Sequence, residues 1–252
     1  MNECETPYDK HWEYRDDFID VGPRFFVRTG LMLRLLSSES RGELLDVGCG
    51  DGAFIAKCLD QGWSVVGMDL SQAAIDRCRG RFDRGERLRL FCSDIAAIAE
   101  EGPFDAVTAG EVLEHIEDDE DFVRRVFALL KPGGAFVLTV PVDMSLWTDA
   151  DAAAGHFRRY TVQEISEKLT RAGFAVEKCI VWGWPLTRML HFRIREVQNR
   201  RMGDEREVAR GKDKLLKVKP LLRLAKYVFL IDNLFNWTGR GVGVVVKARR
   251  PA

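Results

Sequence analysis

The amino-acid sequence predicts an α/β fold built on a doubly wound, mostly parallel, seven-stranded sheet. The first observation is that short apolar runs alternate with segments of helical periodicity, the pattern of a parallel sheet with helices on both faces. The second is segment 43–52, ELLDVGCGDG, where an apolar run ends in an acid and then breaks into glycines at every second position. Apolar residues at helical spacing follow it, which predicts a strand, a tight glycine turn and a helix.

The predicted elements follow one another regularly along the 252 residues. Residues 8–38 are predicted to form two helices, broken at Gly22-Pro23. Strands are predicted near 43–47, 64–69, 87–92, 104–109, 135–140, 174–181 and 241–248, and helices near 51–61, 71–81, 118–130 and 161–172. We therefore divide the chain into an N-terminal helical cap at 1–40, an α/β domain at 41–181 plus 240–250, and a C-terminal helical insertion at 182–239.

Composition points to a soluble globular protein, since 46% of the residues are hydrophobic and 31% are charged. The polar start predicts no secretory signal, and the apolar runs are far shorter than the roughly 20 residues that span a bilayer. The six cysteines form no C-x-x-C pair and show no metal-like spacing with histidine. We therefore expect reduced thiols, no metal site and a cytoplasmic location, with peripheral membrane contact left open.

Charge is distributed unevenly, although the formal net charge is only −1. Residues 1–187 hold 21 Lys and Arg against 33 Asp and Glu, whereas residues 188–226 hold 13 against 5. Within the basic segment an apolar stripe lies opposite Lys219, Arg223 and Lys226, the pattern of a basic amphipathic helix. Such a segment favours an anionic partner, such as a phosphate or a lipid surface, and the alternative is a solvated face packed on its own domain.

Five sequence blocks resemble, in order and spacing, the motifs of class I S-adenosylmethionine (SAM)-dependent methyltransferases. The blocks are LLDVGCGDG (44–52), SVVGMDLS (64–71), CSDI (92–95), FDAVTAGEVLEHI (104–116) and LLKPGG (129–134). The resemblance covers roughly residues 40–145. It implies SAM as the cofactor, S-adenosyl-L-homocysteine as the product, and a sheet whose seventh strand inserts antiparallel beside the sixth.

The chemistry of SAM assigns an expected partner to each part of the cofactor. The glycine turn and Asp46 are expected at the amino-acid end, and Asp94 with Ile95 at the adenine. Asp69 lies 19 residues after Gly50, close to the ~20-residue separation at which an acid meets ribose hydroxyls in these folds. The full set of predicted cofactor-binding residues is Asp46, Gly48, Cys49, Gly50, Asp69, Leu70, Asp94, Ile95, Gly110 and Glu111.

Three residues are the predicted catalytic candidates. His115 follows the fourth strand, at the edge where ligands of open α/β sheets bind. His156 and Tyr160 belong to segment 155–161, GHFRRYT, which resembles a segment of bacterial methyltransferases acting on small or lipid-linked acceptors. A histidine suits proton removal from an acceptor near neutral pH. The alternatives are a structural histidine and a loop anchor, and the aromatic residues Tyr8, Trp12 and Tyr14 are a further candidate lid over the cofactor.

The sequence thus predicts a SAM-dependent methyltransferase that acts on oxygen or nitrogen of a small or lipid-linked, anionic metabolite. No nucleic-acid partner is expected, and the oligomeric state stays open. The rival hypotheses are a non-catalytic SAM-binding or scaffold protein and an RNA or protein methyltransferase. An NAD-dependent oxidoreductase is disfavoured, because Gly52 comes one place early for the dinucleotide fingerprint and Asp46 stands where an apolar residue is usual.

Overall fold

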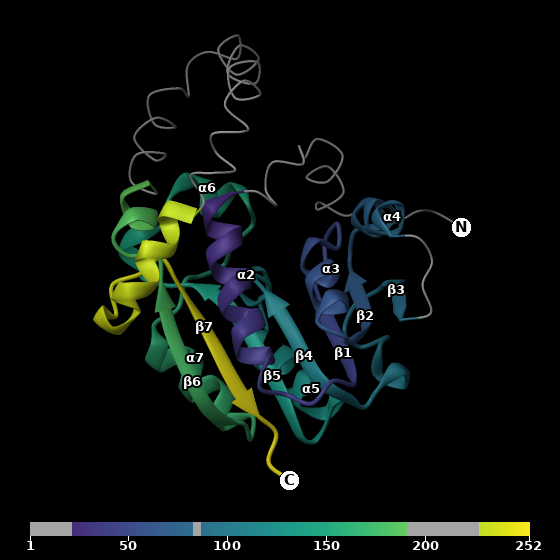
Figure 1. The fold of residues 1–252 in the computed structure, drawn as a ribbon. Helices are drawn as coiled ribbons and strands as arrows, with labels where there is room; N and C mark the ends of the chain where they lie inside the picture. The colour runs from purple at the N-terminus through teal and green to yellow at the C-terminus, as the bar shows by residue number, and fades with distance from the viewer. Residues whose placement is uncertain (1–21, 83–86, 191–226) are drawn as a thin grey trace.

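The computed structural model describes residues 22–82, 87–190 and 227–252 (Figure 1). The predicted first helix, the aromatic residues Tyr8, Trp12 and Tyr14, and the basic stripe with Lys219, Arg223 and Lys226 lie outside the described residues.

Seven strands form a single sheet in the order β3-β2-β1-β4-β5-β7-β6. Their bounds are β1 Glu43–Val47, β2 Ser64–Asp69, β3 Leu88–Cys92, β4 Phe104–Gly110, β5 Leu130–Pro141, β6 Ala175–Trp182 and β7 Gly243–Arg249. Strands β1 to β5 pair in parallel, whereas β7 lies antiparallel between β5 and β6. The predicted doubly wound sheet with an antiparallel last strand is therefore confirmed.

Helices cover both faces of the sheet. The α-helices are α2 Pro23–Leu36, α3 Ala53–Asp60, α4 Gln72–Arg81, α5 Asp119–Leu129, α6 Asp149–Ala153 and α7 Val162–Arg171, and the 3-10 helices are η2 Ala99–Glu101, η3 Leu113–His115, η4 Met144–Leu146 and η5 Phe229–Thr238. Capping residues in the sequence explain where several of these helices begin. Pro23 opens α2, the Ser71 hydroxyl accepts from Ala74 N in α4, and Thr161 with Glu164 forms a capping box before α7.

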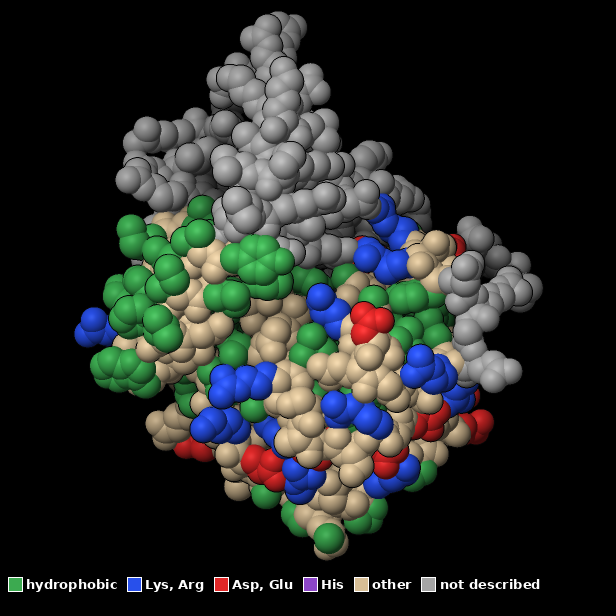
Figure 2. All heavy atoms as spheres, in the orientation of Figure 1, with side chains coloured by type: hydrophobic (Ala, Val, Ile, Leu, Met, Phe, Trp, Pro, Cys, Tyr) green, Lys and Arg blue, Asp and Glu red, His purple; other side chains and the backbone are tan. Residues whose placement is uncertain are grey.

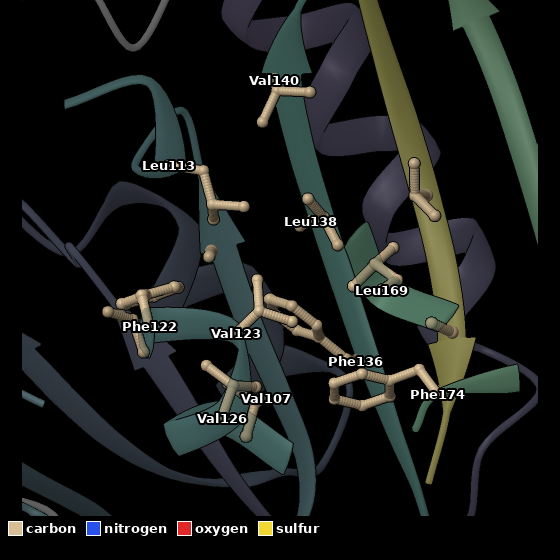
Figure 3. Packing of buried hydrophobic residues seen from close by; sticks show 14 of the residues in the cluster. Val107, Leu113, Phe122, Val123, Val126, Phe136, Leu138, Val140, Leu169 and Phe174 are labelled. Carbon is tan, nitrogen blue, oxygen red and sulfur yellow. The ribbon is translucent and has the colours of Figure 1, made fainter. Parts of the chain in front are cut away.

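The core consists of two apolar clusters, one on each face of the sheet. Successive side chains of a strand point to opposite faces, so Phe136 and Leu138 of β5 join the cluster under α5 and α7, while Val137 joins the cluster under α2 and α3. Figure 3 shows the first cluster, in which Phe136 lies beside Phe174, with ring centroids 5.6 Å apart. Burial on both faces fixes the sheet and therefore the positions of the loops at its carboxyl edge.

One strand boundary differs from the prediction. The sequence predicts a strand that begins near residue 135, whereas β5 begins at Leu130, which pairs with Phe104. The register shifts between this pair and the pair of Ala106 with Ala135. The Lys-Pro-Gly-Gly stretch, expected to be a turn, is thus included within an irregular strand.

Candidate active site

The sheet order places the candidate site at the carboxyl ends of β1 and β4. These neighbouring strands are the switch point of the topology, because β2 and β3 extend the sheet on one side of β1, and β5 extends it beyond β4 (Figure 1). Ligands of open α/β sheets bind in the crevice at such a point. The glycine turn follows β1, and η3 with His115 follows β4, so two of the predicted motifs meet at this edge.

The turn after β1 requires its glycines. Gly48, Gly50 and Gly52 have φ angles of 67°, 56° and 79°, which side chains rarely adopt. A Cβ on Gly48 would lie 2.7 Å from a methyl carbon of Val112, and one on Gly52 would lie 2.5 Å from the Cys78 sulfur. The turn leads into α3, whose N-terminal N–H groups favour an anionic group such as the SAM carboxylate.

Asp69 at the end of β2 is held against the glycine turn. Its Oδ2 accepts a hydrogen bond from Gly50 N at 2.9 Å, and its Oδ1 accepts one from Ser71 N at 3.0 Å. Both carboxylate oxygens are thereby oriented by backbone N–H groups. The predicted ribose acid and the predicted turn are thus in direct contact.

Asp46 lies deeper, within the sheet. Its side chain is buried and accepts a hydrogen bond at 2.7 Å from the Thr108 hydroxyl on β4. Burial raises the pKa of this carboxyl to about 7, the Thr108 hydrogen bond opposes the rise, and the nearby Asp69 charge adds to it. A cation near the turn would favour the ionised form, which agrees with the predicted role beside the SAM ammonium.

The predicted adenine side lies along β2 and β3. Asp94 Oδ1 accepts from the backbone N–H groups of Ala96 and Ala97 at 2.9 and 3.0 Å, which closes a turn after β3. Leu70 is 47% exposed and offers an apolar surface, while Ile95 packs on the core. Ile95 also lines a hollow of about 560 Å³ that extends to Gly102 and Pro103, near the amino end of β4. That hollow therefore extends away from the glycine turn, and we do not assign it to the cofactor.

Two arginines on α2 were missed by the sequence reasoning. Glu111, next to Gly110 at the end of β4, lies 3.2 Å from Arg28 and accepts a hydrogen bond from Thr139. Arg24, one helical turn earlier, has its pKa lowered by burial, which the Glu111 charge opposes. Arg24 and Arg28 are four residues apart, a spacing that places both side chains on one face of α2 and that can be read from the sequence.

His115 and His156 are brought together. Their ring centroids are 4.6 Å apart and the rings are nearly perpendicular, at 89°. Burial and the neighbouring His156 lower the pKa of His115 to about 4, so His115 is neutral at pH 7. The His156 Nδ1 lies 3.2 Å from Asp151 Oδ1, without hydrogen-bond geometry, and the His156 backbone N–H donates to the Asp151 carbonyl.

Tyr160, the third predicted catalytic residue, lies in the hydrophobic core. Its side chain is buried, and its hydroxyl donates to Asp119 Oδ2 at 2.6 Å. Asp119 also pairs with Arg158 and Lys168. Burial and the Asp119 hydrogen bond raise the Tyr160 pKa. The hydroxyl is therefore used in holding the loop, and we give Tyr160 no role in proton transfer.

The comparisons with known proteins agree with this geometry. A family model described as "Methyltransferase domain" matches residues 12–178. A Mycolicibacterium smegmatis protein named "Probable S-adenosylmethionine-dependent methyltransferase" is 29% identical over 161 residues, covering 61% of this chain and 60% of that protein. The ubiquinone biosynthesis O-methyltransferase of Aliivibrio fischeri is 36% identical over 137 residues, covering 53% of this chain and 58% of that protein.

The chain thus spans less than two thirds of the length of these curated relatives. Among solved structures, the N-methyltransferase NodS of Bradyrhizobium japonicum, in complex with S-adenosyl-L-homocysteine, has a TM-score of 0.65 at 18% identity, covering 98% of this chain and 100% of that one. This likeness shows the fold. With the family match over 12–178, the chain belongs to the class I SAM-dependent methyltransferases.

Proposed function

We propose that the protein transfers the methyl group of SAM to an oxygen or nitrogen atom of a small or lipid-linked acceptor by in-line displacement. The observation that carries this proposal is the contact between His115 and His156 at the same strand edge as the glycine turn and Asp69. The proposed cofactor-binding and proton-accepting groups then lie at one edge of the sheet. Holding the nucleophile in line with the methyl group supplies much of the rate.

The cofactor roles follow the structural positions. Asp69 binds the ribose hydroxyls, and residues 48–50 of the turn, with Asp46 below, bind the amino-acid end. Leu70, Asp94 and Ile95 border the adenine. Gly110 and Glu111 border the cofactor at the end of β4, where Glu111 pairs with Arg28.

Oxygen is the favoured acceptor atom. The O-methyltransferase name of the Aliivibrio fischeri relative supports it. A neutral imidazole of the His115–His156 pair can take the hydroxyl proton as the oxygen–methyl bond forms and the sulfur–methyl bond breaks, which releases S-adenosyl-L-homocysteine. Arg24 has no ion pair among the residues that the structure describes, and this positive charge suits an anionic acceptor.

The test separates binding from turnover. Calorimetry with SAM should show binding that Asp69→Ala weakens by roughly 2 kcal/mol or more, because charge-assisted hydrogen bonds are lost. His156→Ala should keep SAM affinity and lower kcat by roughly 100-fold, the scale of general-base catalysis. Phe157→Ala, which changes the exposed neighbour of His156, is the matched control and should change kcat little.

Turnover is measured as S-adenosyl-L-homocysteine release with a panel of hydroxylated and aminated aromatic acids and their lipid-linked analogues. SAM binding without release for any acceptor would favour the rival scaffold function. Binding of NADH in place of SAM would overturn the proposal as a whole.

Peripheral membrane contact is the second part of the proposal. η5 and the residues beside it expose a row of large apolar side chains, and Figure 2 shows hydrophobic side chains gathered over this part of the molecule. The row consists of Met189, Tyr227, Val228, Leu230, Ile231, Leu234 and Trp237. Within the described residues, each helix is too short or too polar to cross a bilayer. A lipid-linked acceptor would reach the cleft from a membrane on which this apolar row rests.

A further inference from the structure

Glu114 is a buried acid whose position the methyl-transfer geometry does not explain. Its side chain is fully buried, and neither carboxylate oxygen has a hydrogen-bond partner within the described part of the chain. Burying a carboxylate without a partner costs free energy. We therefore expect a ligand that supplies a positive charge or a hydrogen bond to bind beside Glu114. The Arg28 and Arg159 charges act on Glu114 without forming an ion pair with it.

Two imidazoles adjoin this carboxylate. The ligand atoms of Glu114, His115 and His156 all lie within 4.8 Å of one another. Nitrogen and oxygen ligands at about 2.0–2.2 Å from one ion lie roughly 3–4 Å apart, so small side-chain rotations would bring all three onto a common centre.

We infer that Glu114, His115 and His156 form a binding site for a divalent transition-metal ion. Two imidazoles and one carboxylate favour zinc, cobalt or ferrous iron over magnesium, which prefers ligand sets made of oxygen. No metal site is predicted from the sequence, because the cysteines show no metal-like spacing with histidine. His156 follows His115 by 41 residues, and the two side chains meet only in the folded chain. The ion would neutralise the Glu114 carboxylate that the protein otherwise buries alone.

Three protein ligands leave at least one coordination position open, for water or for an acceptor oxygen. In a part of the inference that rests on the proposed function, the ion lowers the pKa of the bound hydroxyl, whose proton then leaves to solvent before the oxygen attacks the methyl group. An imidazole nitrogen that binds the ion does not accept a proton. The ion would then replace the histidine pair as the means of activating the acceptor.

The test is metal binding to the tag-free full chain, stripped with a chelator, and needs no acceptor. Titration with cobalt(II) should give one ion per chain, with visible absorption bands typical of a site with nitrogen ligands. Glu114→Gln and His156→Ala should each weaken cobalt and zinc binding at least tenfold. Glu117→Gln, which changes an exposed acid three residues from Glu114, is the matched control and should bind as the wild type does.

Stability supplies an independent measurement. Glu114→Gln replaces a buried carboxyl group that has no hydrogen-bond partner within the described residues with an isosteric amide, so the variant should fold and be about as stable as the metal-free wild type. Zinc should raise the Tm of the wild type and of Glu117→Gln, but not that of Glu114→Gln or His156→Ala. Equal metal affinity of all four proteins would overturn the inference. Metal binding without methyl transfer would leave it standing while the proposed function failed.

Discussion

At the scale of single residues, Asp46 couples stability to cofactor binding. Its folded-state pKa of about 7 lies above the ordinary value of 3.8, because the carboxyl is buried. The folded protein therefore keeps a proton that the unfolded chain has released. This contribution to the free energy of unfolding is fully present below about pH 4 and is lost as the pH rises through 7. An ionised Asp46 at neutral pH is thus destabilising until a cation reaches it.

Asp46→Asn should remove this loss and keep an acceptor for the Thr108 hydroxyl. Relative to the wild type, its free energy of unfolding should rise by about 2–3 kcal/mol between pH 5 and pH 8, measured by urea denaturation without SAM. The comparison with the wild type is needed because the lowered pKa of His115 acts in the opposite direction between about pH 4 and 6.5.

The same substitution should weaken SAM binding, because an amide does not neutralise the SAM ammonium. Asp60→Asn, an exposed acid at the end of α3, is the control for both measurements. A variant that is as pH-dependent as the wild type, or that binds SAM equally well, would remove Asp46 from the cofactor site.

At the scale of elements, the loop from β5 to α7 is held by two buried carboxylates. Asp151 pairs with Arg159 at 2.7 Å and caps α6 through Thr148, and both charged side chains are buried. Asp119 anchors the end of the loop through Tyr160, Arg158 and Lys168. The Phe157 N–H donates to the Glu114 carbonyl at 2.7 Å, which ties the loop to the segment after β4. His156 is therefore positioned by a rigid frame.

Tyr160→Phe tests the difference between an anchor and a catalytic group. Asp119 would lose one hydrogen bond but keep Arg158 and Lys168, so the free energy of unfolding should fall by only about 1–2 kcal/mol. The kcat for methyl transfer should change less than about threefold, whereas loss of a proton-transferring group costs roughly 100-fold or more. A large fall in kcat at unchanged stability would restore the catalytic role that the sequence predicts for Tyr160.

At the scale of the whole molecule, the fold and the contact of the glycine turn with Asp69 could be predicted because their signals are local. The glycine turn, the acid 19 residues after Gly50 and the Thr161–Glu164 capping box each act within a few residues or at a fixed spacing. The sheet then brings Gly50 and Asp69 into contact.

The arrangement of the residues proposed to contact the methyl acceptor could not be predicted from the sequence alone, because it depends on tertiary structure. The contact between His115 and His156 arises because the loop after β5 lies against the segment after β4. The complete burial of Glu114 depends on the packing of the loop between β5 and α7 against it. The positions of Arg24 and Arg28 depend on the packing of α2 over the sheet. The spacing of Arg24 and Arg28 places both on one helix face, but it does not predict that this face lies beside Glu111. In the same way, the position of Glu114 after the fourth strand does not predict that its carboxyl group is fully buried.

The apolar row on η5 makes the last prediction, which concerns the molecule as a whole. Its buried anchor is Asp232, whose carboxylate accepts from the backbone N–H groups of Leu186 and Thr187 at 2.8 Å. This anchor holds η5 in place while Leu234 and Trp237 are 71% and 83% exposed. Large apolar side chains that gather at a surface are typical of interaction sites, and we expect this row to be one.

The basic residues of segment 188–226 adjoin this row in sequence, so an anionic lipid surface is the expected partner. The wild type should sediment with vesicles of phosphatidylcholine and phosphatidylglycerol, less so at high salt. Changing Leu234 and Trp237 to Ser should weaken this binding tenfold or more, because burial of each side chain contributes roughly 1.5–3 kcal/mol. SAM affinity and Tm should stay near wild-type values, since both side chains are exposed.

Met144→Ser, a change at an exposed apolar side chain of η4 that is not part of the row, is the control and should keep vesicle binding. If the double change does not affect vesicle binding, the apolar row does not bind the membrane. Self-association of the wild type without vesicles, lost in the double variant, would identify a second copy of the chain as the partner of the row. Either result would also leave a lipid-linked acceptor without a membrane route to the His115–His156 edge, and a freely diffusing acceptor would then be the better hypothesis.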